Sequence, residues 1–218
     1  MTSTRLPGKV LKTVLGRPLL AYLVERLRRV SQADELVIAT TENRADDPIV
    51  ELSRSMGTTV FRGSEPDVLG RYHGAARDVS ADVVVRVTSD CPLIDPAIID
   101  RCIRTFQENA ERLAYVSNCF PPTFARGMDT EVVSFRALDT AHLEATSPSD
   151  REHVTPFIRR YPDRFPSLNV TDLEDRSWMR LTVDQKEDFE LVSRLLKALV
   201  PVLPAFTYED VLRMLAVI

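Results

Sequence analysis

Two aspartates, Asp90 and Asp184, are the side chains of this sequence that could do chemistry together. Each follows a run of apolar residues and precedes a predicted helix. A carboxylate at the carboxyl end of a buried parallel strand lies where open α/β sheets bind their ligands. If the fold brings the two together, their hard oxygen atoms suit Mg²⁺ and phosphate better than zinc. Each aspartate alone could equally cap a turn or the helix that follows it.

The amino-terminal segment is basic, although the whole chain has a formal net charge of −4. The first acidic residue is Glu25, and the basic residues before it are Arg5, Lys9, Lys12 and Arg17. A basic segment containing Gly and Pro in an acidic protein indicates that a polyanion binds there. The leucines and valines between these charges argue against a disordered basic tail. Backbone amides around Gly8, together with Arg5 and Lys9, could cradle a triphosphate.

Composition and motifs disfavour several other classes of protein. The net charge argues against a nucleic-acid surface, and no apolar run approaches the ~20 residues that span a bilayer. The Walker pattern and the G-x-G-x-x-G pattern are absent, which disfavours NTPases and dinucleotide-dependent dehydrogenases. The three histidines lack the spacing of zinc ligands. The three cysteines show no C-x-x-C spacing, so we expect reduced thiols and a cytoplasmic protein.

The elements that would position Asp90 alternate between helix and strand. We predict strands at 36–40, 58–61 and 83–87, and helices at 18–30, 48–57, 66–79 and 96–109. This order is typical of an α/β protein with a parallel sheet and right-handed crossovers. The β-branched run from Val83 to Val87 predicts a buried central strand that ends shortly before Asp90.

The alternation breaks down after residue 117. There we predict strands at 130–135, 168–171 and 179–183, helices at 135–145, 149–160 and 187–199, and a last helix capped by Thr207 and Asp210. The strand at 179–183 would place Asp184 at a strand end, as the central strand places Asp90. We predict one domain over residues 1–218, in which 119–165 is an insertion that forms a substrate lid or a dimer arm.

Five motifs make the chain resemble the cytidylyltransferase family. They are S-T-R-L-P-G-K-V-L, F-R-G-S-E-x-D-V-L-x-R-Y, V-x-R-V-T-x-D-C-P-L-I-D-P, R-G-x-D-x-E-V and R-E-H-V-T-P, in this order along the chain. The family includes enzymes that form CMP-linked 3-deoxy-ulosonic and nonulosonic (sialic-type) acids. The closest likeness is to its spore-coat-polysaccharide branch. The likeness covers essentially the whole chain, and it is specific for the family but not for the sugar.

The resemblance implies a fold and an activity. The fold would be a three-layer, Rossmann-like nucleotide-diphospho-sugar transferase, with a mostly parallel sheet, helices on both faces and a β/α insertion. The activity would be Mg²⁺-dependent transfer of CMP from CTP to an acidic sugar, with release of pyrophosphate, for surface polysaccharide or glycan synthesis. The family also implies a homodimer formed through the insertion.

The resemblance also assigns roles to individual residues. Arg5, Lys9 and Asp90 would be catalytic, and Asp90 and Asp184 would bind Mg²⁺. The nucleotide-binding residues would be Ser3, Arg5, Gly8, Lys9, Ser64, Asp67, Arg71, Thr88 and Asp90. The acceptor sugar would contact Arg126, Asp129 and Glu131, and an arginine there could pair with the sugar's carboxylate.

Several of these residues also have purely structural explanations. Ser64, Asp67 and Arg71 could be a helix cap, a first-turn charge and a surface arginine. The three predicted acceptor-binding residues could be ordinary loop and strand charges.

The sequence departs from the family pattern at two places. Val183 to Asp188 reads V-D-Q-K-E-D, without the proline that usually precedes Glu-Asp. Family members also begin with a hydrophobic strand, ending in an Ala-Arg step, just before the position of Met1. Either the printed start is internal to the gene product, or the sheet has a gap. Each buried backbone group left unpaired at such a gap costs about 1–3 kcal/mol, so we expect the sheet to close over it or to borrow a strand.

Two alternative functions stay open at this stage. A nucleotide-sugar-dependent glycosyltransferase could share the fold, but Asp90-Cys91-Pro92 lacks the third residue of a D-x-D motif. A non-catalytic protein that binds only nucleotide, or a partner enzyme, would be consistent with the missing strand.

Overall fold

Two separate sheets organise the computed structural model, which describes residues 5–217. In the first, β3 (Val37–Thr41) pairs in parallel with β4 (Thr59–Gly63). Helix α2 (Asp47–Ser55) connects them after the short 3₁₀ helix η2 (Arg44–Asp46). Gly57, with φ of 66°, ends this connection in the left-handed region, as a glycine at that position predicts.

The second sheet has the strand order β5-β7-β6-β8. Its strands are β5 (Val83–Arg86), β6 (Tyr115–Ser117), β7 (Glu131–Ser134) and β8 (Ser167–Asn169). β7 runs antiparallel to both β5 and β6, whereas β6 and β8 are parallel. The prediction of a mostly parallel sheet is therefore wrong for the described residues. The connection from β6 to β7 contains no helix, so β7 can enter beside β6 in the reverse direction.

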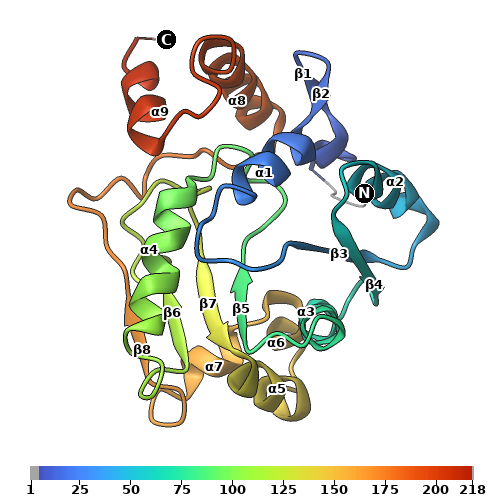
Figure 1. The fold of residues 1–218 in the computed structure, drawn as a ribbon, viewed down its shortest axis with the longest axis vertical. Helices are drawn as coiled ribbons and strands as arrows, with labels where there is room; N and C mark the ends of the chain where they lie inside the picture. The colour runs from blue at the N-terminus through green and yellow to red at the C-terminus, as the bar shows by residue number, and fades with distance from the viewer. Residues whose placement is uncertain (1–4, 218) are drawn as a thin grey trace.

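A gap separates the two sheets, because β3 and β5 are not hydrogen-bonded neighbours among the described strands (Figure 1). A groove of about 330 Å³ lies there, lined by β3, β5, α1 (Leu19–Leu27) and α3 (Val68–Asp78). The sheet has not closed over the gap, contrary to our expectation. β5 is also less buried than predicted, since it borders the groove and Val83 is 38% exposed.

The helices around the lower end of the second sheet form their own apolar cluster. They are α3, α5 (Phe135–Glu144), α6 (Pro148–His153) and α7 (Pro156–Arg160). Leu69, Leu138 and Ile158 are fully buried in this cluster. The predicted single helix over 149–160 is two helices, because Val154 has φ of 74° and Pro156 has no N–H to donate.

The remaining helices pack on the larger core. Helix α4 (Pro96–Gln107) covers β6 and β7, and α8 (Lys186–Leu199) packs against α9 (Tyr208–Leu215) (Figure 1). Thr207 and Asp210 form the predicted capping box at the start of α9. Residues 5–217 contain no helix that is long and apolar enough to cross a membrane.

One prediction about local structure is wrong, and one local feature was not predicted. The run at 179–183 is not a regular strand, and Arg180 makes only an isolated bridge with Arg126. The amino-terminal segment forms a 3₁₀ turn, η1 (Lys9–Leu11), and a small hairpin of β1 (Thr13–Val14) and β2 (Arg17–Pro18), which we did not predict. Helix α1 begins directly after this hairpin.

Candidate active site

Asp90 lies in the loop between β5 and α4, and its carboxylate is held in place locally. The Thr88 hydroxyl donates to Oδ1 of Asp90 at 2.6 Å. The backbone N–H of Val183 donates to the Asp90 carbonyl oxygen at 2.8 Å, which ties this loop to the segment before α8. Asp95 then caps α4 by accepting from the N–H of Ala97 at 2.8 Å. The fold therefore fixes Asp90 at the carboxyl end of β5.

Asp184 lies directly before α8, where a second aspartate fixes its backbone. Oδ2 of Asp188 accepts from the N–H groups of Asp184 and Gln185, each at 2.9 Å. The Arg180 guanidinium lies 3.3 Å from Oδ2 of Asp184 and 3.1 Å from Oδ2 of Asp188. The departure from the family pattern in this segment thus leaves Asp184 in a well-defined position.

Lys9 brings the two aspartates together. Its Nζ lies 2.7 Å from Oδ2 of Asp90 and 2.9 Å from Oδ1 of Asp184. The three side chains are only 16–20% exposed. Gly8, with φ of 66°, turns the chain into η1 and so directs Lys9 toward the aspartates.

Neighbouring charges shift the pKa values of Lys9 and Asp184. Burial lowers the pKa of Lys9, but the hydrogen bonds and negative charges of Asp90 and Asp184 outweigh burial, so the net pKa is raised above 10.5. Burial raises the pKa of Asp184, but Lys9, Arg5 and Arg180 outweigh burial, and its net pKa is lowered. Asp184 is therefore ionised and Lys9 is protonated at neutral pH.

Arg5 adds another positive charge at the same point. Its guanidinium lies 3.3 Å from Oδ1 of Asp184 and is 62% exposed. Such an exposed contact contributes little to stability, which leaves Arg5 able to exchange partners. Lys9, Arg5 and Arg180 together form a cationic group around two carboxylates.

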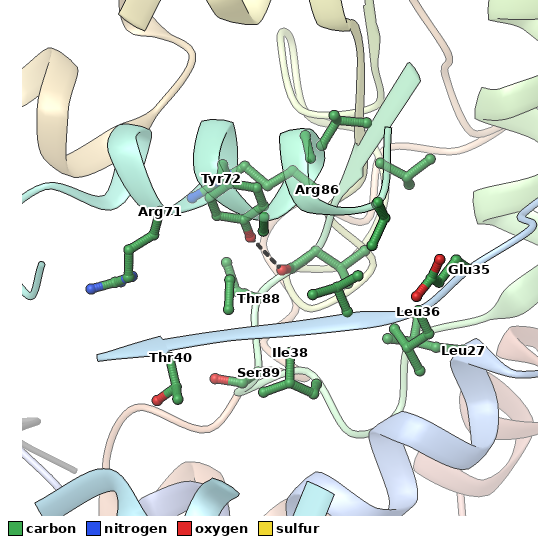
Figure 2. Close-up of a pocket in the computed structure, with 18 of the residues that line it drawn as sticks. Leu27, Glu35, Leu36, Ile38, Thr40, Arg71, Tyr72, Arg86, Thr88 and Ser89 are labelled. Atoms are coloured by element: carbon green, nitrogen blue, oxygen red, sulfur yellow. Dashed lines mark hydrogen bonds between the residues drawn. The ribbon is translucent and has the colours of Figure 1, made fainter. Parts of the chain in front are cut away.

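A cleft of about 260 Å³ opens beside Lys9, at the carboxyl ends of β3 and β5. It is lined by the loop Gly8–Val10, by Thr40 and Thr41, by Arg71 and by Ser89. The cleft shares Thr40, Arg71 and Ser89 with the groove between the sheets. Figure 2 shows the groove along β3, with Leu36 near the start of the strand and Thr40 and Arg71 toward its end. A ligand in the cleft would meet both Lys9 and Arg71.

Only some of the predicted nucleotide-binding residues line the cleft or the adjoining groove. Gly8, Lys9 and Arg71 line the cleft, and Thr88 lines the adjoining groove. Ser64 is exposed and does not line the cleft, but its carbonyl oxygen accepts from Nη1 of Arg71 at 2.8 Å. Ser3 lies outside the described residues.

Asp67 caps α3, a role that we considered for Ser64, whereas the structural alternative for Asp67 was a first-turn charge. Its Oδ1 accepts from the N–H of Gly70 at 2.8 Å, which caps α3. Its Oδ2 forms an ion pair with Arg151 of α6. Asp67 therefore joins two helices and is not among the residues that line the cleft.

The predicted acceptor-binding residues differ in their exposure and partners. Arg126 is exposed and Asp129 accepts from the N–H of Gly127 at 2.8 Å. Glu131 is buried in β7, directly opposite Arg86 of β5, with which it forms an ion pair.

The surroundings of Glu131 correct its predicted role. Its Oε1 also accepts from the hydroxyls of Tyr115 and Thr155, each at 2.5 Å. With these partners and an exposed side-chain fraction of 4%, the carboxylate is enclosed by the protein, which favours the structural alternative.

Sequence analysis missed several residues of the site. Thr40 and Thr41 end β3 at the cleft and donate to Oδ2 of Asp46 at 2.8 and 2.6 Å. The argument that identified Asp90, a polar residue at the end of a strand, applies equally to them. Arg180 was not predicted as a site residue, because the apolar alternation of 179–183 made it look like an outward-facing residue of a strand.

The described residues contain no group of three or more His, Cys, Asp and Glu side chains that could hold a metal ion. Asp90 and Asp184 could nevertheless hold Mg²⁺ if a ligand supplied further oxygens, because Mg²⁺ is commonly bound by one or two carboxylates plus substrate phosphates. The donor set thus fits a metal that binds together with a nucleotide.

Sequence comparisons place the chain among cytidylyltransferases. The family model described as "Cytidylyltransferase" matches residues 1–209. An uncharacterized protein of Methanocaldococcus jannaschii is 39% identical over 197 residues, which are 89% of this chain and 79% of that protein. The spore coat polysaccharide biosynthesis protein SpsF of Bacillus subtilis is 35% identical over 202 residues, 89% of this chain and 82% of that protein. The 3-deoxy-manno-octulosonate cytidylyltransferase of Geobacter sulfurreducens is 37% identical, over 49% of this chain and 42% of that protein.

Solved structures agree with the sequence comparisons. A cytidylyltransferase from Leptospira borgpetersenii has a TM-score of 0.94 and 35% identity, covering 99% of this chain and 90% of that one. A CMP:2-keto-3-deoxy-manno-octonic acid synthetase complexed with CTP has a TM-score of 0.64 at 16% identity, covering 90% of this chain and 94% of that one. The manganese complex of Rv0371c from Mycobacterium tuberculosis has a TM-score of 0.57 at 16% identity, covering 90% and 95%. The last two likenesses show a shared fold.

Proposed function

Because the chain belongs to the cytidylyltransferase family, we propose that it transfers CMP from CTP to the anomeric hydroxyl of an acidic sugar and releases pyrophosphate. The sugar class, ulosonic or sialic-type, is supported by the sequence relative that is named for 3-deoxy-manno-octulosonate. The observation that carries the proposal is the meeting of Asp90, Asp184 and Lys9 beside a cleft at the ends of β3 and β5.

Basic side chains in this region suit the triphosphate of CTP. Lys9 and Arg71 line the cleft, and Arg5 contacts Asp184, which is also a partner of Lys9. We assign Arg5 and Lys9 to the phosphates, where they stabilise the negative charge that builds up on the departing pyrophosphate. Arg71 donates to two backbone carbonyl oxygens, those of Ser64 and Glu65, and this anchoring supports its assignment as a further phosphate contact.

Asp90 and Asp184 are the proposed ligands of Mg²⁺. When bound, the ion would offset charge on the α-phosphate while the sugar oxygen attacks in line. Thr88 and Asp188 keep the two carboxylates in position, through the hydroxyl of Thr88 and through the backbone amides that Asp188 binds.

We also propose that the protein acts in the synthesis of a surface polysaccharide or glycan in the cytoplasm, as a homodimer. The relative named for spore coat polysaccharide biosynthesis supports the first part. Exposed apolar side chains in the insertion 119–165, including Phe120 and Leu143 at 46% and 74% exposure, support an interface there. Light scattering of the purified chain should then give twice the monomer mass.

The test is a pyrophosphate-release assay with CTP, Mg²⁺ and a panel of ulosonic and nonulosonic acids. We expect release with at least one sugar, and a loss of at least about 100-fold in Asp90→Ala. Asp163→Asn, at an exposed position outside the site, is the matched control and should keep full activity. Asp90→Ala within tenfold of wild type would remove Asp90 from the mechanism. Nucleoside diphosphate release without pyrophosphate would identify a glycosyltransferase instead.

The open groove beside the cleft favours one other function, nucleotide binding without turnover. The open edges of β3 and β5 border the site, so its geometry could be incomplete. Thermal-shift titration with CTP and Mg²⁺ separates the two functions. Stabilisation without pyrophosphate release from any sugar of the panel would support binding alone.

A further inference from the structure

We propose that Lys9 takes the place of the divalent cation when no nucleotide is bound, so that the metal binds only as the nucleotide draws the ammonium away. This inference rests on the proposed function for the identity of the nucleotide. One ammonium group and one metal ion then compete for the same two carboxylates.

The contacts of Lys9 are those of a bound cation. Its Nζ bridges one oxygen of Asp90 and one of Asp184, at 2.7 and 2.9 Å. An ammonium is a compact point charge with three donors, so it can serve two carboxylates and keep one donor free. The side chain is only 16% exposed, which makes this a specific contact and not a solvated surface pair.

Both carboxylates already have donors at all of their oxygens. Oδ1 of Asp90 accepts from Thr88 at 2.6 Å, and Oδ2 of Asp184 lies 3.3 Å from Arg180. Lys9 occupies the remaining oxygen of each, Oδ2 of Asp90 and Oδ1 of Asp184, and the exposed Arg5 also lies 3.3 Å from the latter. A metal ion bridging Asp90 and Asp184 must therefore displace the ammonium.

The described part of the protein provides too few metal ligands for a divalent cation to displace Lys9. Among residues 5–217 no third acidic, histidine or cysteine side chain completes a metal-binding group with these two aspartates. Mg²⁺ and Mn²⁺ prefer several oxygen ligands, and phosphate oxygens are the usual supplement. The metal ion alone therefore competes poorly with Lys9.

A nucleotide changes this balance because Lys9 also lines the cleft. Lys9 stands at the start of the short η1 turn, directly after Gly8, and its flexible side chain can turn from the aspartates toward a triphosphate. The triphosphate then offers oxygens to the metal and a new partner to the ammonium. Binding of nucleotide and metal is thereby coupled, and the coupling is reciprocal.

The test measures how tightly the protein binds Mn²⁺ without nucleotide. Electron paramagnetic resonance of the free ion is the readout. We expect Lys9→Met to bind Mn²⁺ at least about tenfold more tightly than wild type, because a competing cation is gone from the carboxylates. Lys12→Met removes the same charge from a lysine whose ammonium lies over the Phe189 ring, and it should change affinity less than twofold. Lys9→Met combined with Asp184→Asn should lose the gain.

Two results would overturn the inference: Lys9→Met that binds Mn²⁺ no better than wild type, or Lys12→Met that gains as much as Lys9→Met. Neither result touches the proposed function, which is judged by pyrophosphate release from the wild-type enzyme.

A second measurement follows the wild-type protein itself, and a variant serves only to identify one signal. The chain has four lysines: Lys9, Lys12, Lys186 and Lys197. Carbon-13 labelling at Cε therefore gives a simple lysine spectrum, in which Lys9→Arg identifies the Lys9 signal. We expect CTP with Mg²⁺ to shift this signal and millimolar Mg²⁺ alone to leave it unchanged. A full shift with Mg²⁺ alone would contradict the inference.

Discussion

Glu131→Gln should destabilise the protein without changing how it binds the acceptor sugar. The wild-type carboxylate is 4% exposed, pairs with Arg86, and accepts from the hydroxyls of Tyr115 and Thr155. Removing one member of a buried ion pair costs about 3–5 kcal/mol, because the partner is left buried without its counter-charge. Glutamine keeps the shape and one acceptor oxygen, and the Arg86 side chain is 20% exposed, so we expect a loss of about 2–4 kcal/mol.

Thermal unfolding measures this loss directly. For a chain of this length, 1 kcal/mol lowers the melting temperature by about 2–4 °C, so Glu131→Gln should melt about 5–15 °C below wild type. Glu152→Gln, at an exposed position of α6, removes the same charge and should melt within about 2 °C of wild type. A Glu131→Gln variant with wild-type stability and a raised KM for the sugar would refute this reasoning and restore the acceptor-binding role.

Three further predictions follow from the same structure. Burial raises the pKa of Asp67, but Arg151 and the Gly70 amide outweigh burial, so its net pKa is below 3.8. The ionised carboxylate should therefore contribute about 1 kcal/mol to the free energy of unfolding above pH 3.8. This contribution should disappear as the pH falls through the lower folded-state pKa. Urea unfolding of wild type and Asp67→Asn should therefore differ at pH 7 and converge in acid, and a constant difference would contradict this. Hydrogen exchange should be faster for the groove-facing amides of β3 and β5 than for β7, which is paired on both sides; equal protection would show that the groove is closed in solution. Burial raises the pKa of the Cys102 thiol to about 12, so this cysteine should react with a thiol reagent only after unfolding, and rapid labelling of Cys102 itself in the native protein would be inconsistent with its burial.

The sequence was most informative where local chemistry decides the structure. The turn at Gly57 and the capping box of Thr207 and Asp210 each depend on a few neighbouring residues. The proximity of Asp90 and Asp184 followed from placing each at the end of an apolar run. That argument worked although 179–183 is not a regular strand, because the N–H of Val183 still binds the Asp90 carbonyl oxygen.

The wrong predictions concern structural features that are not determined by residues close in the sequence. An apolar alternation indicates a strand but not its direction, so the antiparallel course of β7 could not be predicted from residues 130–135. Glu131 looked like an exposed strand charge because its partners, Arg86, Tyr115 and Thr155, are far away in the sequence. The break at Val154 depends on a positive φ that a β-branched residue rarely adopts, and sequence gives no warning of it.

A double-mutant cycle of pyrophosphate release tests the central claim, that Asp90 and Asp184 act together at one centre beside Lys9. The variants are Asp90→Asn, Asp184→Asn and the double substitution, assayed with CTP, Mg²⁺ and the sugar that supports turnover. Residues that act as one unit show strongly non-additive losses. We predict that each single variant loses at least about 100-fold in kcat and that the double variant loses little more. Losses that multiply in the double variant would show that the two carboxylates act separately and would contradict this account.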